Sequence, residues 1–237
     1  MPRKKRLSLR LLVILLGIFL GGQLFARPPL DPLVPVKIRG HVQVMSSPTQ
    51  TGLYMWVRVT RGAEELSGLT ITLKGQKAQE KEKGVYICQI PGYAPAPGTT
   101  IAVVFEGKSP SPIPQPEFPI TAKATVGSLI KISEPLPGTH VPITTKPLLR
   151  VAWVGGTPPY HIHVFPYINP DTLGDAVYEK SDISGTQTGI PTAFFKPGIE
   201  YSLQVFATWA QFIFDKAVDP ASDFKLDQSA TTFIFAD

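Results

Sequence analysis

The chain has 237 residues, enough for one or two domains of ordinary size, and its 43 % hydrophobic content is sufficient to fill their cores. Its 25 prolines, 20 glycines and only 17 % charged residues are typical of a globular β protein rich in turns. The net charge of +5 comes from five basic residues in the first ten positions; without them the 18 remaining basic residues balance 18 acidic ones, which excludes nucleic acid as the main partner.

Residues 1–26 have the pattern of a targeting segment, with a basic start followed by an apolar run from Leu11 to Ala26. This run is shorter than the about 20 apolar residues of a spanning helix, and Ala26 suits cleavage by signal peptidase. We expect either a cleaved signal peptide or an uncleaved membrane anchor through residues 7–26, in which Gly17 and Gly21 would form a helix-dimerisation face. Either form predicts an exported protein, located in the periplasm, on the cell surface or outside the cell, or anchored in the inner membrane with its C-terminal domains outside. Residues 27–35 are rich in proline and predict a stiff spacer.

From Val36 onward, apolar and polar residues alternate with the period of two that is typical of β-strands. The pattern predicts strands over residues 36–44, 53–60, 69–74, 85–90, 101–105 and 118–126, with a charged turn at 77–83 and a proline-rich loop at 108–119. Several short strands without a helical period predict a first β-sandwich over residues 36–127. Cys88, the only cysteine, lies in a predicted strand and is expected to be a small buried hydrophobic residue.

A second sandwich is predicted over residues 128–237, with strands at 129–132, 148–154, 160–167, 176–180, 189–195, 199–208 and 230–235. Trp153 and Tyr160 are expected to point into its core. Tyr201 follows a Pro-Gly turn, and we expect its phenol to hydrogen-bond to the backbone of that turn.

Four motifs in this half resemble fibronectin type III and related bacterial immunoglobulin-like domains. They are Ser133–Gly138 (SEPLPG), Val151–Trp153 (VAW), Gly155–Tyr160 (GGTPPY) and the Pro-Gly-x-x-Tyr-x-Leu-x-Val pattern of Pro197–Val205. The resemblance covers residues 128–237 and is weak over 36–127. It implies an all-β chain of two tandem immunoglobulin-like or fibronectin III-like β-sandwiches, a family that serves as spacers, adhesive modules and enzyme accessory domains. The chain departs from this family at 209–228, where we expect a long loop instead of a short one.

No motif for acyl transfer is recognisable, and the formal phosphate-loop match at 102–109 continues a strand and is followed by Pro110 and Pro112, which forbid the helix that phosphate binding needs. We therefore expect no catalytic residues, no enzymatic activity and no cofactor. His161 and His163 would lie on one face of a strand, a geometry that metals can use. A metal site needs a third or fourth ligand, and no carboxylate flanks the pair, so packed or solvated histidines are the expectation.

The strongest candidate for a binding surface is aromatic. The strands that contain Tyr160 and Tyr201 should be neighbours in one sheet, and the expected partner-binding residues on them and in the following loop are His161, His163, Phe165, Phe206, Trp209, Phe212 and Phe214. Alternatively, the loop folds back over Phe206 and forms a small local core.

The predicted function is that of a non-catalytic exported or envelope-associated module that binds a protein or a glycan partner through β-sandwich surfaces. One alternative is a single-pass, membrane-anchored scaffold subunit of an envelope complex. A more remote alternative is a carbohydrate-binding accessory protein in which Trp209 stacks on a sugar.

Overall fold

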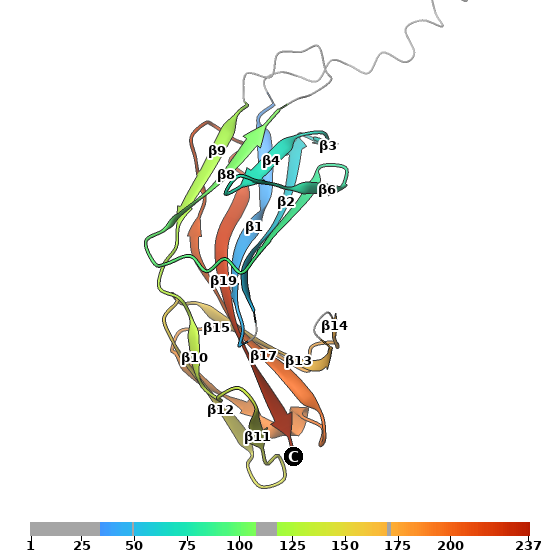
Figure 1. Ribbon diagram of the computed structural model, residues 1–237, viewed down its shortest axis with the longest axis vertical. Helices are drawn as coiled ribbons and strands as arrows, with labels where there is room; N and C mark the ends of the chain where they lie inside the picture. Colours follow the sequence, from blue (N-terminus) through green and yellow to red (C-terminus); the bar gives the residue numbers. More distant parts are fainter. Residues whose placement is uncertain (1–33, 49, 108–117, 170–171) are drawn as a thin grey trace, which may run out of the picture. The chain divides into compact units, whose positions relative to one another are not determined.

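The structure is a computed structural model that describes residues 34–48, 50–107, 118–169 and 172–237 (Figure 1). In these residues every regular element is a β-strand except the short 3-10 helix η1 (Thr192–Phe194). The described chain is therefore all-β, and its sheets are compatible with a β-sandwich. Residues Pro35–Asp237 form one compact unit. The predicted leader at 1–26 and most of the spacer at 27–35 lie outside the described residues.

The first half of the described chain contains nine strands, and the longer ones match the predicted ranges closely. They are β1 (Val36–Ser46), β2 (Thr51–Arg61), β3 (Glu64–Glu65), β4 (Thr70–Leu73), β5 (Gln76–Lys77), β6 (Gln79–Glu82), β7 (Val85–Pro91), β8 (Thr100–Glu106) and β9 (Ile120–Thr125). The prediction of a charged turn at 77–83 is wrong, because β6 forms in this segment and pairs with β7. All four residues of β6 are exposed, and charged side chains on an edge strand discourage pairing with other chains.

The second half contains ten strands. They are β10 (Lys131–Glu134), β11 (Thr139–Val141), β12 (Leu148–Val154), β13 (Tyr160–Asn169), β14 (Thr172–Leu173), β15 (Tyr178–Ile183), β16 (Gln187–Pro191), β17 (Glu200–Gln211), β18 (Ile213–Phe214) and β19 (Asp223–Ala236). The strand expected at 189–195 ends earlier, at Pro191, and η1 begins at the next residue, Thr192.

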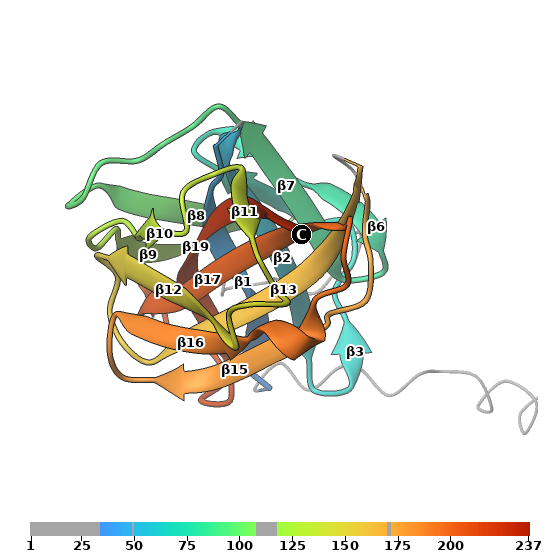
Figure 2. The same ribbon diagram turned by 90° about the horizontal axis from the view of Figure 1, so that it is seen from below.

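One large sheet runs through both halves of the compact unit. Its strand order is β14-β13-β17-β19-β1-β2-β7-β6, so β17, β19 and β1 lie side by side in its middle (Figure 1). The antiparallel pair β13 and β17 can also be followed from below in Figure 2. Two smaller sheets have the orders β18-β9-β8-β4-β5 and β10-β12-β16. We call the first of these the β8 sheet.

Strand β19 joins the two halves. Its residues 223–230 pair in parallel with residues 39–46 of β1, while its other edge pairs antiparallel with β17. Phe224 and Leu226 belong to a first hydrophobic core, and Ala230 and Ile234 belong to a second. The first core therefore takes residues from both sides of position 127, where the sequence analysis placed a domain boundary. The division into two domains at that position stays a prediction.

The prediction of a long loop at 209–228 is wrong. Strand β17 continues to Gln211, β18 pairs with β9, and β19 begins at Asp223. The physical reason is the burial of Phe212 and Phe224, which stack with ring centroids 4.4 Å apart in the first core. The segment thus packs into the first core. It was expected either to expose its rings for a partner or to fold back over Phe206.

The aromatic residues that were expected to organise the second core are buried there. The rings of Trp153 and Tyr160 meet edge to face at 5.2 Å, and the Tyr160 hydroxyl donates to the Gly155 carbonyl at 3.0 Å. The Tyr201 hydroxyl accepts a hydrogen bond from the backbone N–H of Lys196 at 2.8 Å, which closes the Pro-Gly turn before β17.

Candidate functional site

The outer face of the large sheet carries two groups of half-buried aromatic side chains. Along each strand they alternate with fully buried residues, because successive side chains of a strand point to opposite faces of the sheet. We call these side chains the aromatic face; its members are His161, His163 and Phe165 on β13, Phe206 on β17, His41 on β1, and Tyr54 and Trp56 on β2.

The first group lies on β13 and β17. His161 is directly opposite Phe206 in the ladder, and the ring of His163 lies 5.0 Å from that of Phe206 and 5.9 Å from that of Phe165. The neighbouring positions Ile162 and Val205 are fully buried. The pairing of these two strands was predicted from the sequence, and the ladder between them brings the four residues together.

The second group lies on β1 and β2 and was not among the residues predicted to bind a partner. His41 is directly opposite Trp56, and the centroids of their rings are 6.4 Å apart. The centroid of the His41 ring also lies 6.0 Å from that of Tyr54. The alternation of Tyr54 and Trp56 with buried Met55 is visible in the sequence. The sequence does not show that β19 places these strands in the same sheet as β17.

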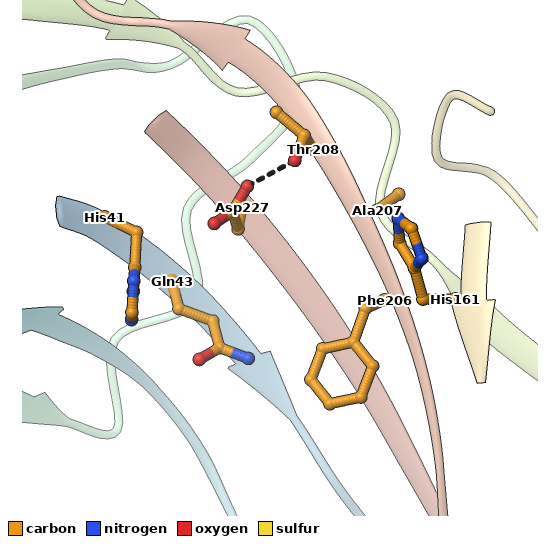
Figure 3. A pocket seen from close by; sticks show the side chains of 7 residues that line it. All are labelled: His41, Gln43, His161, Phe206, Ala207, Thr208 and Asp227. Carbon is orange, nitrogen blue, oxygen red and sulfur yellow. Dashed lines mark hydrogen bonds between the residues drawn. The ribbon is translucent and has the colours of Figure 1, made fainter. Parts of the chain in front are cut away.

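Between the two groups is a hollow of about 260 Å³, lined by His41, Gln43, His161, Phe206, Ala207, Thr208 and Asp227 (Figure 3). These side chains come from four adjacent strands of the large sheet, β1, β19, β17 and β13. The Thr208 hydroxyl donates to Asp227 Oδ1 at 2.6 Å. Gln43 is the register partner of Asp227 on β1. The hollow therefore combines ring surfaces with one carboxylate and one amide.

The histidine pair lies on this face. His161 lines the hollow, while His163 packs between two phenylalanine rings. Among the described residues, no group of three or more His, Cys, Asp and Glu side chains is placed to hold a metal ion.

Trp209 lies away from the aromatic face, at the link between the two cores. Its indole Nε1 donates to the Ser128 carbonyl at 3.1 Å. A methyl group in place of a hydrogen at Gly127 would lie 2.7 Å from Trp209 Cδ1, so any larger residue would force the indole ring to shift.

The buried amide of Gln228 holds the same link. Its Nε2 donates to the Ser128 carbonyl at 3.2 Å, and its Oε1 accepts from the Ile130 backbone N–H at 2.8 Å. The backbone N–H of Gly156 donates to the same Ser128 carbonyl at 2.9 Å. Trp209 and Gln228 together fix the chain where it passes from the first core to the second.

The remaining two aromatic candidates belong to the first core. Phe212 is only 4 % exposed, so the expectation of an exposed ring there is wrong. Phe214 is half-buried and packs against the same core. Of the seven candidates for partner binding, the structure thus brings together four on one surface: His161, His163, Phe165 and Phe206.

A second depression, of about 510 Å³, lies beside β9 and β18. Its carboxylate, Asp215, accepts a hydrogen bond from the Thr121 backbone at 2.7 Å and so holds β18 against β9. Its other lining residues are largely apolar or threonine, without a cluster of aromatic rings. The hollow on the aromatic face is the better candidate for a binding site.

Within the described residues, no helix is long and apolar enough to cross a membrane. The candidate anchor at residues 7–26 lies outside them.

No family model matches the sequence, and no curated protein matches it. A search of solved structures matched a chimeric titin Z1Z2 functionalised with an exogenous peptide from decorin, at 11 % sequence identity and a TM-score of 0.23. This match covers 86 % of the present chain and 97 % of the titin chain. The chain is β-rich and compatible with an immunoglobulin-like or fibronectin III-like fold, and a similarity at this TM-score adds no argument about function.

Proposed function

We propose that the chain is a non-catalytic binding module, exported or associated with the cell envelope, and that it binds its partner through the aromatic face. Its two halves would be immunoglobulin-like or fibronectin III-like sandwiches that share one sheet. The observation that supports this proposal is the continuity of that sheet, which presents two groups of half-exposed rings with a hollow between them.

Aromatic rings on a sheet face supply a large contact area at a low cost in conformational entropy, and such side chains are enriched at recognition surfaces. The rings of the aromatic face lie on strands that are hydrogen-bonded on both sides, so the backbone that carries them is held in place before a partner arrives. A preorganised surface loses little entropy on binding, which favours a binding role.

The proposal is tested by placing a photo-reactive amino acid at position 206, or at position 72 as a control, in the full chain expressed in its own host. Thr72 lies on β4, on the half-exposed side of the β8 sheet. We expect a covalent adduct on irradiation at position 206 and none at position 72. Equal labelling at both positions, or none at position 206, would refute binding through the aromatic face.

The site of action is proposed from the leader sequence. An intact mass that begins at Arg27, measured on protein from the soluble fraction, would support an exported module. A full-length mass retained in the membrane fraction would instead favour the anchored scaffold, and Gly17 and Gly21 would be the next residues to substitute.

A further inference from the structure

We propose that the ligand of the hollow and the aromatic face is a neutral oligosaccharide. This inference rests on the proposed binding function and names the chemical class of the ligand.

The hollow offers the two kinds of contact that a sugar ring needs. A sugar presents apolar C–H groups on its faces and hydroxyl groups around its edge, so it pairs best with flat rings that stand beside hydrogen-bonding groups. Phe206 and the imidazole of His161 supply ring surface from adjacent strands. Asp227 and Gln43 supply hydrogen-bonding groups from the next two strands.

The hydrogen-bonding groups in the hollow have unused capacity. Thr208 occupies only one oxygen of the Asp227 carboxylate, and among the described residues the other oxygen and the Gln43 amide have no hydrogen-bond partner. A carboxylate oxygen accepts hydrogen bonds from hydroxyl groups, and an amide both donates and accepts. Both therefore suit a polyhydroxylated ligand.

The charges around the hollow favour a neutral ligand over an anionic one. The ammonium of Lys225 lies 3.1 Å from the Asp223 carboxylate, and the guanidinium of Arg58 lies 3.8 Å from that of Glu65. Both of these basic groups are thus paired, Arg39 on β1 interacts electrostatically with Asp223, and no salt bridge engages Asp227 among the described residues. An anionic polymer would be repelled by the Asp227 carboxylate, whose charge no salt bridge offsets.

The backbone around the hollow favours a sugar over an extended peptide. Peptides that bind to sheets commonly add a strand along an unpaired edge. Here β17, β19 and β1 are each paired on both sides, so recognition must rest on side chains alone.

The dimensions favour an oligosaccharide over a single sugar. Phe206 on β17 and Trp56 on β2 are three strand spacings apart, about 14 Å across the strands, and are also offset along them, because Trp56 is level with Gln211. A chain of several sugar rings that crosses the strands could contact both groups of the aromatic face. Affinity should therefore rise with the length of the oligosaccharide.

The test is calorimetric titration of the full chain with hexasaccharides of glucose, mannose, xylose and N-acetylglucosamine, with the matching monosaccharides and a hexauronic acid for comparison. We expect at least one neutral hexasaccharide to bind, more tightly than its monosaccharide and than the uronic acid. Phe206→Ala should weaken this binding roughly tenfold because a stacking ring is lost. Asp227→Asn keeps an oxygen to accept from Thr208 and should weaken it severalfold. Thr72→Ala should bind like the unmodified chain.

Thermal unfolding of each variant controls for loss of the fold, and Asp227→Asn provides a nearly isosteric second variant. The inference is overturned if no neutral hexasaccharide binds, if the uronic acid binds best, or if both substituted chains keep full affinity. A protein adduct at position 206 without any sugar binding would refute the sugar and leave the binding function in place. Failure of both experiments would refute both.

Discussion

Substitution of Phe224 by alanine should destabilise the first core although this residue lies near the C-terminal end of the chain. The Phe224 side chain is 1 % exposed, stacks on Phe212 at 4.4 Å and meets Phe105 edge to face at 6.1 Å. Loss of such a ring leaves a cavity that typically costs about 3–5 kcal/mol in free energy of unfolding. For a unit of this size each kcal/mol lowers the Tm by roughly 2–4 °C, so we expect a fall of about 6–20 °C.

The assay is urea and thermal unfolding of the full chain, followed by near-UV circular dichroism and by tryptophan fluorescence. Because β19 belongs to both cores, the two signals should change in a single transition in the unmodified chain and in the variant. Phe235→Ala is the matched control on the same strand, since Phe235 is 36 % exposed; we expect it to cost under about 1 kcal/mol.

A contribution of Phe224 to the first core would be refuted if Phe224→Ala cost no more than Phe235→Ala. It would also be refuted if a fragment of residues 35–127 unfolded cooperatively and as late as the full chain. That fragment lacks Phe212, Phe224 and Leu226 of the first core, as well as the strand that pairs in parallel with β1.

Three further substitutions test buried polar side chains. Gln228→Leu should cost about 1–3 kcal/mol in urea unfolding, because the buried Ile130 N–H loses its acceptor; an unchanged midpoint would refute the role of this amide. Tyr201→Phe should cost about 1 kcal/mol by the same assay, since the Lys196 N–H loses the phenol oxygen; a larger loss would indicate disturbed packing instead. Burial raises the pKa of Tyr86 to about 12, from about 10 in an unfolded chain, so the unfolded state ionises first and stability should fall as the pH rises from about 10 to 12. Tyr86→Phe should show a smaller fall in unfolding free energy over that range, and an equal fall would contradict the assignment.

Most of the strands, and which of their side chains are buried, could be predicted from the sequence alone. The predicted strand at 148–154 has the observed bounds of β12, and the inward positions of β13 and β17 are buried as the alternation indicated. The reason is local: a period of two places neighbouring residues on opposite faces, and only the apolar set is stable when buried. The pairing of β13 with β17 followed from the motifs that resemble fibronectin type III domains, and it brought His161 next to Phe206.

The position of the last segment, and with it the extent of the candidate site, depends on how the whole chain packs. The alternation of Phe224 and Leu226 with Lys225 and Asp227 is visible in the sequence and indicates a strand with one buried face. It does not say which sheet receives that strand, because the same pattern suits either core. Only the packing of the whole chain pairs β19 with β1, some 180 residues apart in sequence, and so places Asp227 and Gln43 beside Phe206 in one hollow.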